Sequence, residues 1–321
     1  MFTKLGFDDT TVRRSVGDRQ PGSFQLFPTE VALSLALVVL FAMSIGLPSY
    51  YAQAVNWPAF APAIVAFVCM MVIGAYARGA KRAPRFALGM IGVGIFMAFT
   101  CTIAIVAYTF FPFSNPRIDL TLIALDAQIG FDWVSYVEWV ASVPGLGQFL
   151  SDVYVSSLYQ MVLTVLLLAW LNQARQMHRF LVTGVMTMSV TIAFWRAWPS
   201  IGPPPYVSIP PEIEAKAALI ADAEVGDMLL RFATEGNAII TPEIVTGIVS
   251  FPSYHLMMAC IVVWFTQRTA LFIPALVINL AMIPATLLHG GHHLIDLPAG
   301  ILTFAACLWL TYKLVPDPRP D

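Results

Sequence analysis

The chain has 321 residues, of which 58% are hydrophobic and only 11% are charged, and its mean hydropathy is +0.76. A soluble domain carries charges on about a quarter of its residues, so this composition excludes a large soluble protein. The net charge of −2 and the lack of any basic run or aromatic–basic stripe exclude nucleic acid as a partner. We therefore expect an all-α, polytopic membrane bundle whose partners are membrane lipids.

Eight apolar runs are long enough to form membrane helices, since a hydrocarbon core takes about 20 helical residues. They are 30–48, 58–77, 86–111, 152–171, 180–198, 251–267, 269–288 and 296–314. With both termini in the cytoplasm, thirteen of the seventeen basic residues fall on the inner side, in agreement with the positive-inside rule. The short tails favour a bacterial inner membrane, and the outer side of the bundle then faces the periplasm.

The runs divide the chain into four parts. We expect a cytoplasmic tail at 1–29, which keeps its N-terminus, and two additional transmembrane helices at 30–85. A six-helix core at 86–315 and a short C-terminal tail at 316–321 follow. The tail lacks the apolar centre of a signal peptide, so no cleavage is expected.

Two connections of the core are long, 112–151 and 199–250, and both are expected outside the cytoplasm. The first shows helical periodicity and predicts one or two helices on the outer surface, with Trp133, Tyr136 and Trp139 in an interfacial belt. The second opens with a Pro-rich turn and predicts an acidic amphipathic helix near Glu212–Glu235. This helix is either a solvated cap or a lid over a lipid site.

Four of the five histidines lie in Ser250–Gly300, namely His255, His289, His292 and His293. The segment SFPSYH opens the sixth run, and HGGHHLIDLPAG opens the eighth. Two membrane crossings, the sixth and seventh runs, separate the two segments, so both segments lie at the same, outer face of the membrane. Arg196, near the outer end of the fifth run, reaches that face as well. Ionisable groups next to lipid are costly and therefore indicate a functional site.

The spacing of these polar residues predicts phosphoryl chemistry. His292 and Asp296 are four residues apart, so the carboxylate can fix the imidazole tautomer and leave the other ring nitrogen as a nucleophile or base. His255 can act as a general acid, and Ser253 can donate a hydrogen bond to a phosphoryl oxygen. Pro252 suits the first turn of a helix, whose free N–H groups attract anions.

Two glycines and one arginine complete the predicted phosphate site. Gly290 and Gly291 would let the backbone approach a bulky anion closely. Arg196 either contacts the phosphate or extends its side chain to the membrane interface, and the sequence leaves both readings open.

These residues carry a family resemblance. SFPSYH resembles the PSxH motif of the type-2 phosphatidic acid phosphatase superfamily, and GGHHLIDLPAG resembles its GxHxxxD motif, with Gly290, His292 and Asp296 in register. The bare FPSxH, the GGHHxxD and LDAQIGFDW at 125–133 are most similar to the inositolphosphotransferase branch, which resembles inositol phosphorylceramide synthase. The resemblance covers about 86–312, so the six-helix core is expected to be the catalytic part.

The resemblance implies that His292 attacks phosphorus to form a phosphohistidine, with Asp296 orienting it. His255 would protonate the departing alcohol and then assist water or an acceptor alcohol. Ser253 would belong to the phosphate cradle, and no metal or other cofactor is required. The expected reaction is the transfer of an inositol-phosphate-like headgroup between lipids, or lipid phosphate hydrolysis if water is the acceptor.

The chain departs from the phosphatase motifs at two places. Ala285 and Thr286 stand where a Ser–Arg pair precedes the nucleophilic histidine. In the KxxxxxxRP motif, Ser189 stands at the Lys position and Ala197 follows Arg196. Loss of a bidentate arginine is not conservative for phosphate recognition, so these departures favour a transferase over a broad phosphatase.

A metal-binding or transport protein is the non-enzymatic alternative. His289 and His293 are four residues apart, a spacing that suits either auxiliary site residues or metal ligands on a helix. No Glu accompanies them as in HExxH, and Gly290–Gly291 interrupts the helix that would present them. The sequence therefore predicts no metal site.

Overall fold

The computed structural model describes residues 26–317 except 52, 82, 238, 246 and 248. Most of the predicted tails 1–29 and 316–321 thus lie outside the described residues. The elements are α1 Pro28–Tyr50, β1 Ala54–Val55, α2 Trp57–Gly79, α3 Pro84–Tyr108, α4 Asp119–Gln128, α5 Trp133–Ser142, α6 Leu146–Trp170, α7 Ala174–Ala197, the 3₁₀ turn η2 Pro204–Tyr206, α8 Pro211–Lys216, α9 Ala223–Glu235, β2 Ile239–Ile240, α10 Tyr254–Thr266, α11 Phe272–His289 and α12 Asp296–Leu314.

Seven of the described helices are long and apolar enough to cross a membrane, and the predicted all-α polytopic bundle is confirmed. The chain is an integral, multi-pass membrane protein. The remaining predicted crossing, 251–267, is present as α10, which has only 13 residues. At 1.5 Å per residue α10 is about 20 Å long, less than a hydrocarbon core of about 30 Å.

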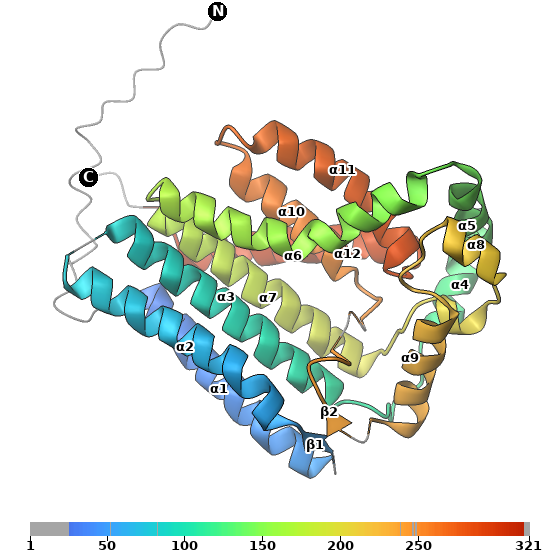
Figure 1. Cartoon of the computed structure of the whole chain (residues 1–321), viewed down its shortest axis with the longest axis horizontal. Coiled ribbons are helices and arrows are strands. Elements are labelled where there is room, and N and C mark those ends of the chain that lie inside the picture. The colour runs from blue at the N-terminus through green and yellow to red at the C-terminus, as the bar shows by residue number, and fades with distance from the viewer. Residues whose placement is uncertain are drawn as a thin grey trace, which may run out of the picture.

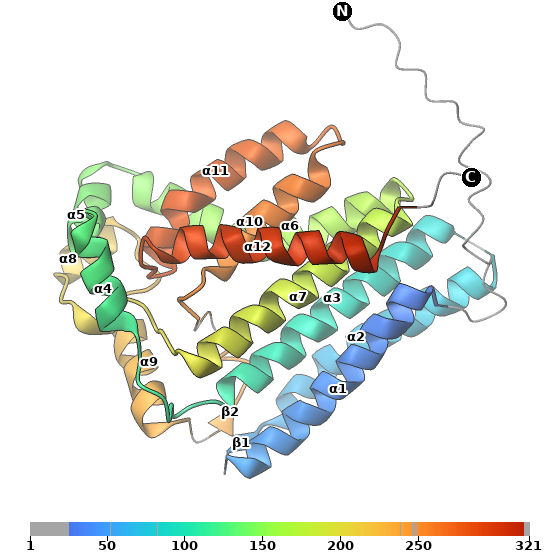
Figure 2. The same cartoon turned by 180° about the vertical axis from the view of Figure 1, so that it is seen from behind.

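The membrane helices form one bundle around α3, α6, α7 and α10 (Figures 1 and 2). α10 packs against α6, α7, α11 and α12, while α1 and α2 pack against α3 on one side of the bundle. Buried side chains from α3, α6, α7 and α10 fill the main core, among them Ile91, Met161, Met177, Met257 and Ile261. α1 and α2 leave most of their apolar residues uncovered, as expected of helices that face lipid.

The four short helices α4, α5, α8 and α9 gather at one end of the bundle (Figure 1). Two helices in 112–151 agree with the prediction, but the predicted aromatic belt is wrong in part. Trp133 is buried and its Nε1 donates to the carbonyl of Leu287 at 2.8 Å, and the Tyr136 hydroxyl donates to the carbonyl of Pro284 at 2.9 Å. These two residues therefore fix α5 to α11, and only Trp139 is exposed.

The predicted single helix at Glu212–Glu235 is wrong, because the segment is divided into α8 and α9. Asp222 is the N-cap of α9 and accepts a hydrogen bond from the N–H of Val225 at 2.9 Å, which starts a new helix. The turn between the helices packs against α6, where Gly147 lies so close to Ala217 that a Cβ would come within 2.2 Å of its carbonyl oxygen. Tertiary packing thus overrides the continuous amphipathic pattern.

A two-residue parallel bridge joins the segment 199–250 to the N-terminal helices. Ala54 pairs with Ile239 and Val55 with Ile240, so the α1–α2 connection is tied to the end of 199–250. The connection between α9 and α10 then returns into the bundle and reaches the first histidine motif.

Candidate active site

The second motif forms the turn between α11 and α12 and presents His292. α11 ends at His289, and α12 begins at Asp296, so His292 lies in the connecting loop rather than on a helix. The predicted pair is nevertheless present, since Nδ1 of His292 lies 3.0 Å from Oδ2 of Asp296 and both side chains are buried. A carboxylate at the first residue of a helix is also favoured by the helix dipole.

The first motif forms the start of α10 and lies against the second. Ser253 is the N-cap of α10, and its Oγ accepts a hydrogen bond from the N–H of Leu256 at 3.4 Å. Pro252 therefore precedes the helix instead of lying in its first turn. The N–H of Ser253 donates to the carbonyl of Asp296 at 3.2 Å, and Gly300 of α12 is so close that a Cβ would lie 2.7 Å from the carbonyl oxygen of Ser253. The two motifs are thus joined through their backbones.

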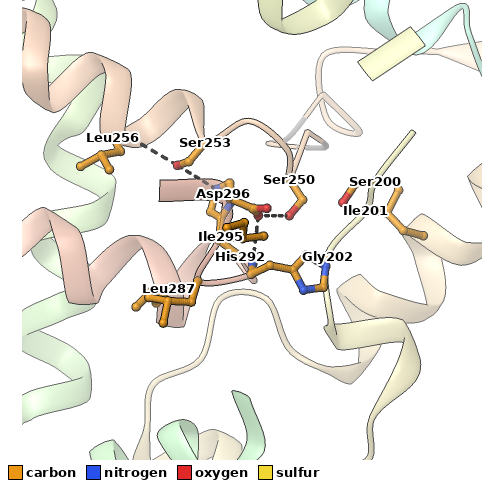
Figure 3. Close-up of polar contacts among 12 residues, drawn as sticks. Ser200, Ile201, Gly202, Ser250, Ser253, Leu256, Leu287, His292, Ile295 and Asp296 are labelled. Carbon is orange, nitrogen blue, oxygen red and sulfur yellow. Dashed lines mark hydrogen bonds and ion pairs between the residues drawn. The ribbon is translucent and has the colours of Figure 1, made fainter. Parts of the chain in front are cut away.

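The side chains of the two motifs converge (Figure 3). Nε2 of His292 lies 3.4 Å from the hydroxyl of Ser253, and the rings of His292 and His255 are 6.4 Å apart between centroids. His255 stacks on the ring of Tyr154 in α6, at 4.2 Å between centroids and 25° between planes. With Nδ1 bound to Asp296, His292 directs its free Nε2 lone pair toward Ser253, on the side of His255.

The Asp296 carboxylate accepts hydrogen bonds from two residues besides His292. Its Oδ2 accepts hydrogen bonds from the hydroxyl of Ser250 at 2.6 Å and from the N–H of His293 at 2.9 Å, in addition to His292. Three donors on one oxygen of the buried carboxylate fix its orientation. A fixed carboxylate in turn fixes the tautomer and the ring plane of His292.

His293 points away from His292 and lies between two buried carboxylates. Its Nε2 is 3.6 Å from Oδ1 of Asp119, and its Nδ1 is 3.6 Å from Oδ2 of Asp126. Burial lowers the pKa of His293, but Asp119, Asp126 and Asp296 together raise it to about 9, so the ring is a cation at neutral pH. Asp126 also accepts the N–H groups of Leu294 and Ile295, which fixes the loop before α12.

Asp119 fixes the Pro-rich segment over the second motif. It is fully buried and accepts hydrogen bonds from the hydroxyls of Ser200 and Tyr206 and from the N–H groups of Ile201 and Gly202. Figure 3 shows the backbone segment Ser200–Gly202 beside the loop that carries His292.

The two glycines of the second motif serve the packing of this loop. A Cβ on Gly290 would lie 2.5 Å from the ring of His292, so the glycine makes room for the imidazole. Gly291 has a φ of +53° and packs against Pro204, where a Cβ would be 2.8 Å from its ring. Their contacts are with protein atoms, which differs from the expected role of exposing backbone to an anion.

Arg196 is not brought to the histidines by any hydrogen bond or ion pair in the described part of the chain. Its Nη2 lies 3.4 Å from the Tyr51 hydroxyl, and its guanidinium stands over the Phe110 ring at 5.4 Å. The carbonyl of Arg196 accepts a hydrogen bond from the side chain of Asn115. These contacts fit the interfacial reading of Arg196 better than the phosphate-binding one.

The two residues of the metal hypothesis, His289 and His293, have different partners. Nε2 of His289 lies 3.1 Å from the carbonyl of Gly147, while its buried Nδ1 has no hydrogen-bond partner among the described residues. His293 is occupied by Asp119 and Asp126. Among the residues that the structure describes, no group of three or more His, Cys, Asp or Glu side chains is arranged to hold a metal ion.

Five of the residues that build this site were missed by sequence reasoning, namely Asp119, Asp126, Tyr154, Ser200 and Ser250. Asp126 lies in the segment 125–133 that carries the family resemblance, and its side chain is buried. The available signal was the acidic residues of 112–151 in an otherwise apolar chain, since a carboxylate near lipid needs a partner. Ser250 and Tyr154 carry no distinguishing pattern of their own.

The sequence was compared with protein-family models, curated proteins and solved structures. No curated protein and no solved structure matches the chain. The model of the PAP2 superfamily matches residues 120–310, which are more than half of the 321 residues, include both histidine motifs and run from α4 into α12. The match does not distinguish the inositolphosphotransferase branch, which stays a prediction from the motifs. The chain belongs to the PAP2 superfamily.

Proposed function

We propose that this membrane protein is a lipid phosphotransferase that acts through a phosphohistidine on His292. The observation that carries the proposal is the chain of contacts from Ser250 through Asp296 to His292, with the free Nε2 facing Ser253 and His255. An oriented imidazole with one lone pair directed into a shared site is the arrangement expected of a nitrogen nucleophile.

In the first half-reaction, Nε2 of His292 attacks phosphorus, and the bond from phosphorus to the donor's alcohol oxygen breaks. His255, in its protonated form, gives a proton to that oxygen, and the donor leaves as a neutral alcohol. Asp296 balances the positive charge that the phosphorylated imidazole carries. The 6.4 Å between the two rings is suited to one phosphoryl group standing between them.

In the second half-reaction, the hydroxyl of an acceptor attacks phosphorus while neutral His255 takes its proton. The bond between phosphorus and Nε2 breaks, and His292 returns to its starting tautomer. The first turn of α10, which begins at Tyr254 after the N-cap Ser253, would offer N–H groups to the phosphoryl oxygens. The same steps with water as acceptor would give a phosphatase.

We propose the transferase over the phosphatase for two reasons. Ser253, His292 and Asp296 are at most 1% exposed, so bulk water has little access to phosphorus. In addition, Thr286, a small and buried side chain, stands where the phosphatases carry an arginine. The donor is then a phospholipid with a phosphorylated, inositol-phosphate-like headgroup, and the acceptor is a lipid alcohol.

We further propose that the six helices of 86–315 form the catalytic core and that the site faces the periplasmic side of a bacterial inner membrane. The outer segments 112–151 and 199–250 would then cover it. Labelling of engineered cysteines in the α4–α5 and α6–α7 connections of intact cells tests this orientation, because only the former should react with an impermeant reagent.

The test of the reaction uses the purified full-length protein in detergent with phosphatidic acid or phosphatidylinositol as donor. Ceramide or diacylglycerol is added as acceptor or left out, and a chelator is present in a parallel series. Headgroup transfer that requires the acceptor supports the transferase, and phosphate release without acceptor indicates the phosphatase. Loss of activity with chelator would point to the metal alternative instead.

The nucleophile is tested in the same assay with His292→Ala. We expect activity to fall by at least about a thousandfold, because the covalent step has no other nucleophile. With donor labelled in the phosphoryl group, the wild type should trap an acid-labile, base-stable label that His292→Ala lacks. Full activity in His292→Ala would refute the mechanism.

A further inference from the structure

A cavity lined by charged side chains lies at the opposite end of the bundle from the histidines. Its volume is about 790 Å³, and its lining comes from the α6–α7 turn, the start of α7 and the ends of α10 and α12. The histidine site is at the other ends of α10 and α12 (Figures 1 and 2). The 19 residues of α12 alone separate the two ends by about 28 Å. The cavity is thus independent of the site described above.

Three arginines line this cavity, Arg175, Arg179 and Arg268. Arg179 is only 2% exposed, and its Nε donates to the carbonyl of Val315 at 2.8 Å, which leaves the rest of the guanidinium facing the cavity. Arg175 and Arg268 form no ion pair within the described ranges of the chain. With Asp317 as the only acidic residue in the described part of its lining, the cavity has an excess of positive charge that favours an anionic ligand.

The carboxylate of Asp317 already pairs with one of the three arginines in the cavity. Oδ1 of Asp317 lies 3.0 Å from Nη2 of Arg179, although the Asp317 side chain is 70% exposed. An exposed carboxylate on a buried guanidinium is held weakly and can be displaced. The planar guanidinium binds carboxylate and phosphate oxygens in the same way, so Asp317 stands where a phosphate oxygen would bind.

One wall of the cavity is aromatic and is formed by Trp264, Phe265 and Tyr312. Trp264 donates from Nε1 to the Tyr312 hydroxyl at 3.2 Å, and the Tyr312 ring lies 4.0 Å below the Arg179 guanidinium. Trp264 is 37% exposed on an apolar helix, so acyl chains can lie against its outer side. Arginine with Trp and Tyr at the end of a membrane helix suits the headgroup region of a bilayer.

We propose that this cavity binds the phosphate group of an anionic phospholipid through Arg175, Arg179 and Arg268, with Asp317 as an internal competitor. The shared chemistry is a phosphate oxyanion, which a lipid headgroup or free phosphate could supply. An ordinary basic patch that only sets membrane orientation would need neither a cavity nor a buried arginine. The inference does not depend on the reaction proposed for His292.

The test measures lipid binding by quenching of Trp264 with brominated lipids. Full-length protein in neutral detergent micelles is titrated with brominated phosphatidylglycerol or brominated phosphatidylcholine, and the signal of a Trp264→Phe variant is subtracted. We expect tighter binding of the anionic lipid. Arg268→Gln and Arg175→Gln should each weaken it by about fivefold, the contribution of one basic residue at an anionic surface.

Lys313→Gln is the matched control, since Lys313 carries the same charge on α12, is exposed and lies over Trp309 outside the cavity lining. Lys313→Gln should leave the preference for the anionic lipid unchanged, whereas Asp317→Asn should strengthen binding by a few-fold. Equal quenching by both lipids, or an equal loss in Lys313→Gln and Arg268→Gln, would overturn the proposal.

Competition with inorganic phosphate at constant ionic strength distinguishes a lipid headgroup from free phosphate as the ligand. Displacement of the lipid indicates that free phosphate suffices, and retention of the lipid indicates a site for the lipid.

Discussion

The hydroxyl of Ser250 donates a 2.6 Å hydrogen bond to Oδ2 of Asp296, the same oxygen that accepts from Nδ1 of His292. The two residues are 46 positions apart and come from different connections of the bundle. Ser250, the first residue of the SFPSYH motif, therefore orients the carboxylate of the second motif. This contact makes Ser250 a positioning residue for the imidazole.

Ser250→Ala should lower kcat by about tenfold to a hundredfold, since a hydrogen bond to a charged group contributes about 1.5–3 kcal/mol. KM should change little, because Ser250 acts through Asp296 and His292. Steady-state kinetics on the purified variant measure both constants. Ser44→Ala is the control, because Ser44 is also buried and donates to a backbone carbonyl in α1, remote from the histidines. An unchanged kcat in Ser250→Ala would contradict the positioning role.

Gly300→Ala should reduce activity by about a hundredfold, because the new Cβ would lie 2.7 Å from the Ser253 carbonyl oxygen and displace the first motif. Gly46→Ala is the matched control, since a Cβ there meets nothing within 4 Å. Alanine is favoured over glycine in a helix by about 1 kcal/mol, so Gly46→Ala should keep activity and gain slightly in thermal stability. Initial rates and unfolding midpoints in detergent distinguish the two variants, and equal activity would show that the close approach is unimportant.

Asp126→Asn should destabilise the fold by about 1–3 kcal/mol, because buried His293 then keeps only one of its two carboxylate partners. Asp132→Asn changes the same kind of side chain six residues later, where the carboxylate only caps α5 by accepting from the N–H of Ser135. Asparagine caps a helix about as well as aspartate, so this control should stay within about 0.5 kcal/mol. Denaturant unfolding in mixed micelles gives both values. Similar losses in the two variants would refute a special role for Asp126.

The stability of the protein should fall as the pH rises above neutrality. The pKa of His293 is raised in the fold to about 9 from an ordinary value of 6.5, so the folded state binds its proton more tightly than the unfolded state. The stabilisation is complete below about pH 6.5 and is lost as the pH rises through about 9, and its size is on the order of 3 kcal/mol.

Unfolding midpoints measured across this pH range should show the decline in the wild type. His293→Gln should be less stable at neutral pH and should lose most of the dependence, because no imidazole titrates between Asp119 and Asp126. A wild-type profile that is flat between about pH 6.5 and 9 would show that His293 is neutral in the fold.

Much of the fold and part of the site could be predicted from the amino-acid sequence. Apolar runs of about 20 residues have one stable arrangement in lipid, a helix that satisfies its own backbone hydrogen bonds, so the membrane helices follow directly. Counting crossings placed both motifs at one face, and the four-residue spacing of His292 and Asp296 identified their contact. These inferences depend only on local periodicity and on the even number of membrane crossings between the two motifs.

The contacts that hold the site depend on residues with no local signal. Asp126 binds the N–H groups of Leu294 and Ile295 from 168 and 169 positions away, and Asp119 fixes the segment at 200–206. Which carboxylate meets which cation or N–H group depends on how the outer helices pack, and the division of Glu212–Glu235 into α8 and α9 depends on the same packing.

By itself, the sequence determined that this chain forms an apolar helical bundle with two histidine motifs at one end, because hydropathy and helical period are properties of neighbouring residues. Only the tertiary structure decided that Ser250 and Asp126 serve the site, that Arg196 turns to Tyr51, and that three arginines surround a cavity at the far end. The physical reason is that hydrogen bonds and ion pairs are made at about 3 Å between side chains, and such distances across a bundle are fixed by packing rather than by position in the chain.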